Sequence, residues 1–225
     1  MTEEHFTELT KYERELAGKG VRIIAGLDEA GRGPLAGPVA AGCVIFKAEG
    51  PLPEADDSKK LSPKKRDALY DEITQMSLGW GVGLADSEEI DMLNILQATY
   101  LAMKRAVDNA LKCALERGNS TMPEIVLVDH VHVPGLEIPQ LSITHGDALS
   151  VTIGAASIIA KVTRDRMMDE YDKIYPGYMF AAHKGYGTKA HYDAIGKLGL
   201  SPIHRRSFLK NLAEHGCGGG SGNDR

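Results

Sequence analysis

Cysteine is scarce in this chain, which has three, Cys43, Cys113 and Cys217, among its 225 residues. An odd number with no CxxC spacing excludes a disulfide framework and a cysteine-based zinc site, and it is typical of a reducing compartment. Long apolar runs are also missing, because the longest uncharged stretches, residues 33–46 and 148–160, are shorter than the roughly 20 residues that span a bilayer. No basic flank and apolar core open the chain, so no signal peptide is expected. These absences predict a soluble, cytoplasmic protein.

Internal repeats and abrupt changes of composition are absent as well. The chain is 43% hydrophobic and 25% charged, which excludes wholesale disorder. We therefore expect a single domain over residues 1–215, followed by a flexible Gly-rich tail over residues 216–225. The net charge of −5 argues weakly against a non-specific binder of polyanions. Residues 151–225 nevertheless carry 11 Lys and Arg against 7 Asp and Glu, which fits either a phosphate-contacting face or an ordinary solvated surface.

The order of apolar patterns and turn residues predicts the secondary structure. Strands are expected over residues 21–27, 39–46, 78–85, 124–129 and 140–144. Helices are expected over residues 6–16, from 63 onward with Ser62 as N-cap, and over 90–115 (one or two helices), 148–175, 188–198 and 205–214. Early strands followed by mixed helices predict one α/β domain, with a central mixed sheet flanked by helices and a helical carboxyl-terminal region.

Two adjacent acids, Asp28 and Glu29, end an apolar strand and lead directly into a Gly-rich loop at Gly31 to Pro34. A Gly-rich loop exposes backbone N–H groups to which a phosphate or a sugar can come close. Paired acids there would repel a phosphate unless a divalent cation lay between them, and Mg²⁺ takes carboxylate and phosphate oxygens as ligands. The segment therefore favours metal-dependent phosphate chemistry.

Other interpretations of the same segment are open. Residues 31–36 match the GxGxxA dinucleotide pattern, with Asp56 or Asp57 at the distance of a ribose partner. That fingerprint requires a helix next, whereas residues 39–46 look like a strand. Residues 26–33 resemble a P-loop but lack its Lys-Ser/Thr. A tight hairpin turn with solvated acids is the simplest alternative.

Two further acids have both a functional and a structural interpretation. Asp129 ends an apolar strand, where α/β proteins often gather site residues, although Asp also forms turns. Asp147 precedes the longest helical pattern, where Asp is a good N-cap. His130 and His132 alternate on the face opposite Asp129 and are interpreted as surface histidines.

Six segments in series resemble the bacterial ribonuclease HII family. They are DEAGRGPLAGPV (28–39), DSKKLS (57–62), GD (146–147), AASIIAKVTRD (155–165), YP with HKGYGT (175–188) and HRRSF (204–208). The resemblance covers roughly residues 21–210. It implies a ribonuclease-H-like fold and an endonuclease, dependent on Mg²⁺ or Mn²⁺, that hydrolyses RNA in RNA–DNA hybrids. It also implies incision on the 5′ side of a ribonucleotide in duplex DNA, which leaves a 5′-phosphate and a 3′-hydroxyl.

The same resemblance assigns the metal-binding carboxylates. Asp28, Glu29, Asp129 and Asp147 match the four acids of the family, and two cations held by such a set fit two-metal catalysis. One departure is visible, since His130 stands where the family often has a glycine.

The resemblance also implies substrate-binding residues. Gly31, Arg32 and Gly33 resemble a loop whose backbone reads the 2′-hydroxyl, and Tyr186 resembles the tyrosine that packs beside it. Two basic residues, Lys59 and Lys184, are expected near backbone phosphates, whereas Arg164 and Asp165 are interpreted as a structural pair on one helix.

Partners and rival functions follow from these assignments. The expected partners are RNA–DNA hybrids and duplex DNA containing ribonucleotides, with a monomeric enzyme, no membrane and no recognisable clamp- or polymerase-docking motif. The related ribonuclease HIII usually has an extra amino-terminal domain, for which the segment before Val21 is too short. The rival hypotheses are a dinucleotide-dependent oxidoreductase built on residues 31–36 and a non-catalytic hybrid-binding module, although binding alone gives no reason to cluster acids against a polyanion.

Overall fold

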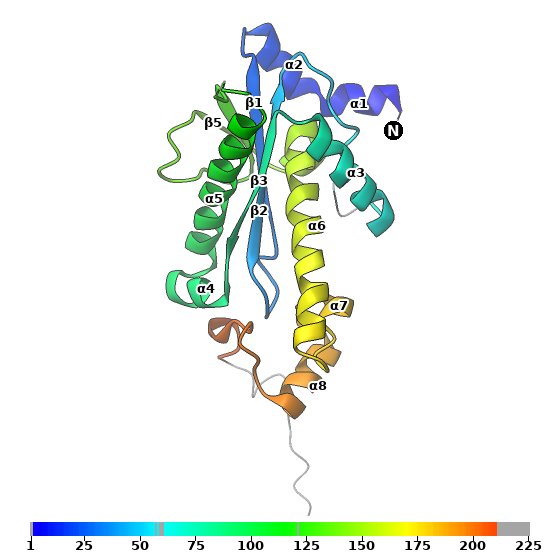
Figure 1. Ribbon diagram of the computed structural model, residues 1–225, viewed down its shortest axis with the longest axis vertical. Coiled ribbons are helices and arrows are strands. Elements are labelled where there is room, and N and C mark those ends of the chain that lie inside the picture. The colour runs from blue at the N-terminus through cyan, green and yellow to red at the C-terminus, as the bar shows by residue number, and fades with distance from the viewer. Residues whose placement is uncertain (1, 57, 59–60, 121, 211–225) are drawn as a thin grey trace, which may run out of the picture.

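A five-stranded mixed sheet lies at the centre of the chain, with helices on both of its faces (Figure 1). The structure, a computed structural model, describes residues 2–56, 58, 61–120 and 122–210. Its strands are β1 (Ile23–Ala30), β2 (Val39–Lys47), β3 (Gly79–Ala85), β4 (Ile125–Asp129) and β5 (Gln140–Ile143). Their order is β3-β2-β1-β4-β5, in which β2 is antiparallel to β1 and β3, whereas β4 is parallel to β1 and β5. The expected α/β class and mixed sheet are confirmed.

The helices follow the sequence pattern closely in the centre of the chain. They are α1 (Glu3–Leu9), α2 (Lys11–Gly18), α3 (Pro63–Met76), α4 (Ser87–Leu93), α5 (Ile95–Glu116), α6 (Val151–Ile174), α7 (Phe180–His183) and α8 (Lys189–Leu198), with 3₁₀ turns η1 (Gly146–Ala148) and η2 (Arg206–Phe208). Ser62 caps α3 by accepting a hydrogen bond from the Lys65 N–H, as expected. None of the helices among the described residues is long and apolar enough to cross a membrane.

Glycines let the two longest helices lie directly on the sheet. A Cβ atom on Gly26 of β1 would lie 2.1 Å from the Thr152 carbonyl oxygen, and one on Gly42 of β2 would lie 2.3 Å from that of Ala156. Both backbones therefore touch α6 on one face of the sheet. The three glycines of β3 play the same part toward α5 on the other face, where a Cβ on Gly83 would lie 1.9 Å from the Ala102 carbonyl oxygen.

A third apolar cluster joins the carboxyl-terminal helices to the Gly-rich loop. Leu35 and Ala36 of the loop pack with Met168 of α6 and Phe180 of α7. Figure 1 shows α7 beside the lower part of α6 and α8 below it. This cluster brings residues around 186 and 205 to the end of β1.

Three expectations differ from the structure. The helix expected over 6–16 is two helices that meet at Thr10, and the long helix begins at Val151 rather than at residue 148. The helix expected over 205–214 is wrong for its described part, which is the 3₁₀ turn η2. The remaining residues of that helix, and the tail over 216–225, lie outside the described residues.

Candidate active site

Asp28 lies at the carboxyl-terminal end of β1 and is only 4% exposed. Its register partner on β2 is Gly42, over which α6 passes, and Ser157 of α6 hydrogen-bonds the Asp28 side chain. Burial, together with the nearby charges of Glu29 and Asp129, raises the pKa of Asp28 well above its usual value. The fold therefore disfavours the ionised form of this carboxyl group.

Asp129 comes next to Asp28 through the parallel pairing of β1 with β4. Leu27 pairs with Val128, so each strand continues into its acid at the same edge of the sheet. The Asp129 Oδ1 atom accepts a hydrogen bond of 2.7 Å from the Gly146 N–H. That bond ties the end of β4 to η1, which carries Asp147.

Asp147 is buried in η1, with 6% of its surface exposed. Its structural interpretation as a helix cap is wrong, because Ser150 caps α6 by accepting from the Ile153 N–H. Asp147 instead belongs to η1, the turn that Asp129 anchors through the Gly146 N–H.

Glu29 follows Asp28 and is paired with a cation of the loop. Its Oε1 atom lies 3.3 Å from Nη1 of Arg32, and its side chain is 14% exposed. This ion pair links the acidic end of β1 to the Gly-rich loop that follows it.

The acids fit a divalent cation that is shared with a substrate rather than enclosed by the protein. Among the described residues, no three His, Cys, Asp or Glu side chains gather closely enough to hold an ion by themselves. Mg²⁺ keeps several waters and is commonly held by one or two carboxylates plus substrate phosphates. The raised pKa of Asp28 points the same way, since a cation would relieve the repulsion among these acids.

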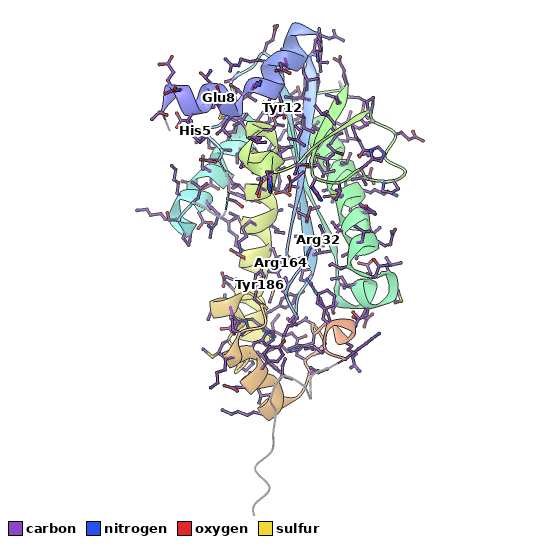
Figure 2. All side chains as sticks on the ribbon, turned by 180° about the vertical axis from the view of Figure 1, so that it is seen from behind. His5, Glu8, Tyr12, Arg32, Arg164 and Tyr186 are labelled. Carbon is purple, nitrogen blue, oxygen red and sulfur yellow. The ribbon has the colours of Figure 1, made fainter. Side chains whose placement is uncertain are left out.

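Beside the acids lies a pocket of about 240 Å³. It is lined by Glu29, Ala30, Gly31, Arg32, Gly33, Ser58, Ser157, Lys161, Arg164 and Tyr186. Figure 2 labels Arg32, Arg164 and Tyr186, which approach one another from the loop, from α6 and from the segment before α8. The structure thus brings together four of the predicted substrate-binding residues, namely Gly31, Arg32, Gly33 and Tyr186.

The two predicted phosphate-contacting lysines are placed differently. Lys184 does not line this pocket; its ammonium pairs with Asp169, and it lines a neighbouring groove together with Lys161 and Arg166. Lys59 lies outside the described residues.

Sequence reasoning missed Ser157 and Lys161, which line the pocket from α6. Their spacing of four residues places them on one face of the helix, and Ser157 Oγ lies 3.0 Å from Ser58 Oγ. Both lie inside the motif at 155–165, so their spacing of four residues on one helix face could have identified them in the sequence.

Arg164 has a structural role, as expected, but its hydrogen bonds go to backbone carbonyl oxygens rather than to Asp165. Its buried guanidinium donates to the carbonyl oxygens of Pro38 (2.9 Å), Lys184 (3.0 Å) and Ala36 (3.1 Å). Asp165 instead accepts from Lys161 Nζ at 2.7 Å. Both residues therefore have structural partners, and Asp165 acts on Arg164 through its charge.

His130 and His132 are exposed, which confirms their interpretation as surface histidines. The strand ends at Asp129, and His130 adopts a left-handed conformation with φ of +57°. Glycine reaches that conformation without strain, which explains why a glycine would suit this position.

The dinucleotide-binding interpretation is wrong. The residues after the Gly-rich loop form strand β2, whereas the pyrophosphate of a dinucleotide needs a helix N-terminus. Asp56, a proposed ribose partner, lies 3.0 Å from the His5 ring, and Figure 2 shows His5 well apart from Arg32.

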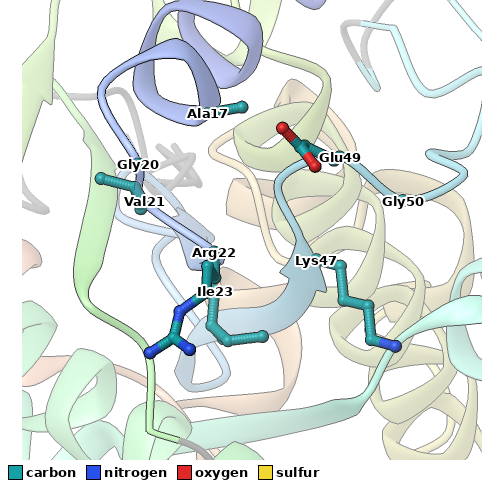
Figure 3. Close-up of a pocket in the computed structure, with 8 residues that line it drawn as sticks. All are labelled: Ala17, Gly20, Val21, Arg22, Ile23, Lys47, Glu49 and Gly50. Carbon is teal, nitrogen blue, oxygen red and sulfur yellow. The ribbon is translucent and has the colours of Figure 1, made fainter.

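A second hollow, of about 390 Å³, lies at the other end of β1 (Figure 3). Ala17, Val21 and the basic side chains of Arg22 and Lys47 line it. None of the predicted site residues lines this hollow.

Comparisons with known proteins agree with this site. A family model described as Ribonuclease HII matches residues 25–211. The chain is 51% identical over 210 residues to the ribonuclease HII of Clostridioides difficile (strain 630), which covers 93% of this chain and 79% of that relative.

Solved structures share the fold. Ribonuclease H2 from Pyrococcus horikoshii OT3 has a TM-score of 0.67 at 24% identity, covering 86% of this chain and 98% of that one. Bst-RNase HIII in complex with Mn²⁺ has a TM-score of 0.56 at 16% identity, covering 80% of this chain and 63% of that one. The expected ribonuclease-H-like fold is confirmed.

Proposed function

Since the chain belongs to the ribonuclease HII family and is a ribonuclease H that hydrolyses the RNA strand of RNA–DNA hybrids, we propose that it also incises duplex DNA on the 5′ side of a single embedded ribonucleotide. The products are a 5′-phosphate and a 3′-hydroxyl. One observation carries the proposal: the pocket that adjoins the acids is lined by the Gly-rich loop on one side and by Tyr186 on the other.

The 2′-hydroxyl is the group that distinguishes RNA from DNA at one sugar, and it both donates and accepts hydrogen bonds. Gly31 and Gly33 flank Arg32 without side chains of their own, so a sugar can approach the backbone there. Tyr186 is 46% exposed, and its ring is free to stack on the neighbouring deoxyribose. The pocket therefore supports recognition of one ribonucleotide followed by DNA.

Asp28, Glu29, Asp129 and Asp147 are proposed to hold the divalent cations, Mg²⁺ or Mn²⁺. When bound, these cations supply activation of the attacking water and stabilisation of the leaving oxygen. Bst-RNase HIII, which shares this fold, has been solved in complex with Mn²⁺. The chain's own part would be to present the acids near the ends of β1 and β4 and in η1, and to orient Asp129 through the Gly146 N–H.

The basic residues of the carboxyl-terminal third complete the proposed substrate path. Lys161 lines both the pocket and the neighbouring groove, which also holds Lys184. We expect Lys161 and Lys184, with Lys59, to approach backbone phosphates and to make binding depend on salt. The enzyme is further proposed to act as a cytoplasmic monomer with one catalytic domain over residues 1–215.

A thermal-shift titration combined with a cleavage assay tests the proposal. Mn²⁺ should raise the melting temperature by neutralising the clustered acids, and NADH should leave it unchanged. Duplex DNA with one ribonucleotide should be cut only when a divalent cation is present, and the all-DNA duplex should stay intact. Binding of the substrate without cutting at any cation concentration would favour a non-catalytic hybrid-binding module.

A further inference from the structure

Arg205, which follows α8, forms hydrogen bonds with the backbone of the Gly-rich loop. It is completely buried, and its guanidinium donates to the carbonyl oxygens of Gly31 (2.6 Å), Arg32 (2.8 Å) and Gly37 (2.9 Å). Three acceptors at these distances match the planar fork of arginine, which a lysine ammonium cannot reproduce.

The geometry of the peptide bond fixes what this clamp does to the loop. All peptide bonds in the described part of the chain are trans, and a trans peptide directs its C=O and N–H to opposite sides. The carbonyls of Gly31 and Arg32 point at Arg205, so the N–H groups of Arg32 and Gly33 point away from it. Arg32 and Gly33 both line the pocket, so the hydrogen bonds from Arg205 fix the direction of two N–H groups in its wall.

Two buried histidines, His191 and His204, form a hydrogen-bond chain to the backbone of Tyr186, which lines the pocket opposite the Gly-rich loop. The Ser201 N–H donates to Nδ1 of His204 at 2.9 Å, so that nitrogen carries no proton and the neutral ring is protonated on Nε2. His204 Nε2 lies 3.0 Å from Nε2 of His191, which must then accept. The proton of His191 is therefore on Nδ1, from which it donates to the Tyr186 carbonyl oxygen at 2.9 Å.

Both rings stay neutral at physiological pH. Burial lowers the pKa of His191 and of His204 to about 4. The direction of these hydrogen bonds therefore holds under the conditions in which the enzyme works.

We propose that Arg205 and His191 are positioning residues that fix the two walls of the pocket and thereby set the discrimination between ribose and deoxyribose. Arg205 orients the N–H groups of the Gly-rich loop, and His191 holds the backbone of Tyr186. His204, the neighbour of Arg205 in sequence, selects the tautomer of His191 and joins the two walls. The inference rests on the proposed recognition of the 2′-hydroxyl and names the residues that make it possible.

The test is a binding measurement that needs no cleavage. In an Asp129→Asn background with Mg²⁺, the Kd is measured for a duplex with one ribonucleotide and for the matching all-DNA duplex. Arg205→Lys should reduce the ratio of the two Kd values by about fivefold to tenfold, the effect of losing one oriented hydrogen bond, while the Kd for all-DNA duplex changes little.

Two substitutions of His191 form a matched pair. His191→Asn keeps an N–H donor at the position of Nδ1, whereas His191→Gln moves the amide to the position of Nε2 and loses the bond to Tyr186. Both disturb the buried cluster, but only His191→Gln should reduce the ratio of Kd values. If Arg205→Lys does not fold, as judged by its melting curve, the His191 pair decides.

The outcomes separate the inference from the proposed function. A parent protein that binds both duplexes equally contradicts recognition of the 2′-hydroxyl itself. A parent that discriminates, with His191→Gln and folded Arg205→Lys discriminating equally well, overturns the positioning role.

Discussion

At the scale of single residues, burial of an acid proposed to bind metal lowers the stability of the fold. Asp28 is buried beside two other carboxylates, and its pKa is raised by burial first and by its neighbours' charges second. Folding therefore favours the neutral form, while binding of a cation needs the ionised one. Without metal, protonated Asp28 contributes to the stability of the fold at low pH, and this contribution is lost as the pH rises through the raised pKa.

Replacing Asp28 with Asn should separate these two effects. Asp28→Asn removes a metal ligand and should lower the cleavage rate by at least about 100-fold. The same change removes a buried ionisable group. The free energy of unfolding of the metal-free variant should therefore rise by on the order of 1 kcal/mol, and its unfolding temperature by a few degrees. Calorimetry with EDTA and single-turnover kinetics with Mg²⁺ check both parts, and an unfolding temperature that drops together with full activity would contradict the assignment.

Tyr186 has a role that can be tested without disturbing the core, because it is half exposed. Tyr186→Ala should slow incision at a single ribonucleotide by about 10- to 100-fold, for the loss of 1–3 kcal/mol of oriented contact. Tyr186→Phe keeps the stacking surface and serves as the control. Cleavage of a long RNA–DNA hybrid should suffer less, and near-wild-type rates on both substrates would exclude a role in recognising the junction.

The site residues that could be predicted from the sequence are those that belong to contiguous sequence motifs. Asp28, Glu29 and the Gly-rich loop form one contiguous motif, and Asp129 ends an apolar run. Arg205 could not be assigned in this way, because its acceptor Gly31 is 174 positions away and the contact exists only once the carboxyl-terminal cluster has packed. Nothing local distinguishes a buried arginine from a surface one.

At the scale of elements, α6 is the part on which the site depends. It contacts the sheet through Gly26 and Gly42 and presents Ser157, Lys161 and Arg164 to the pocket. Any change that lifts α6 from the sheet therefore moves three pocket residues together.

Gly26→Ala should have that effect. Its Cβ would lie 2.1 Å from the Thr152 carbonyl oxygen, a backbone atom that cannot rotate away. We expect a loss of about 2–3 kcal/mol in the free energy of unfolding, measured by urea denaturation. Gly18→Ala is the control, because nothing lies within 4 Å of its Cβ and alanine suits a helix better than glycine. Equal stabilities of the two variants would mean that β1 and α6 are less tightly packed than this distance implies.

The elements themselves were largely predictable, and hydrogen bonds account for the places where a helix is divided or replaced. Asn94 separates α4 from α5 with φ of +70°, while its side chain accepts from the Leu96 and Gln97 N–H groups. The helix expected after residue 205 is replaced by η2 because Asp91 accepts from the N–H groups of Arg206 and Ser207. Such distant hydrogen bonds override the helical pattern, which records only local preference.

At the scale of the whole molecule, stability should depend on pH through the buried histidines. The pKa of His191 and of His204 lies near 4 in the fold, below the ordinary value of 6.5. The two histidines contribute fully to the free energy of unfolding above pH 6.5. That contribution is lost as the pH falls toward 4, because the histidines of the unfolded chain take up protons at a higher pH than those of the folded chain. The titratable groups whose rings contact them are His183 and Tyr178, and the charge of a protonated His183 also disfavours their protonation.

Urea denaturation at pH 7, 6 and 5 measures this contribution. We expect a loss on the order of 1–3 kcal/mol over that range. The measurement is best made in Asp28→Asn, which removes the opposite contribution of that acid. A variant with both His191→Asn and His204→Gln should show a flatter dependence, and an unchanged slope would mean that other groups control acid stability.

The most direct measurement maps the cut in a duplex DNA that contains one ribonucleotide. The strand is labelled at either end and incubated with Mg²⁺ or Mn²⁺, and the products are separated under denaturing conditions. We predict one cut, on the 5′ side of the ribonucleotide, with a 3′-hydroxyl on the upstream fragment and a 5′-phosphate on the downstream one. The matching all-DNA duplex should stay intact. A cut on the 3′ side, equal cutting of the all-DNA duplex, or cleavage that persists in EDTA would contradict the account.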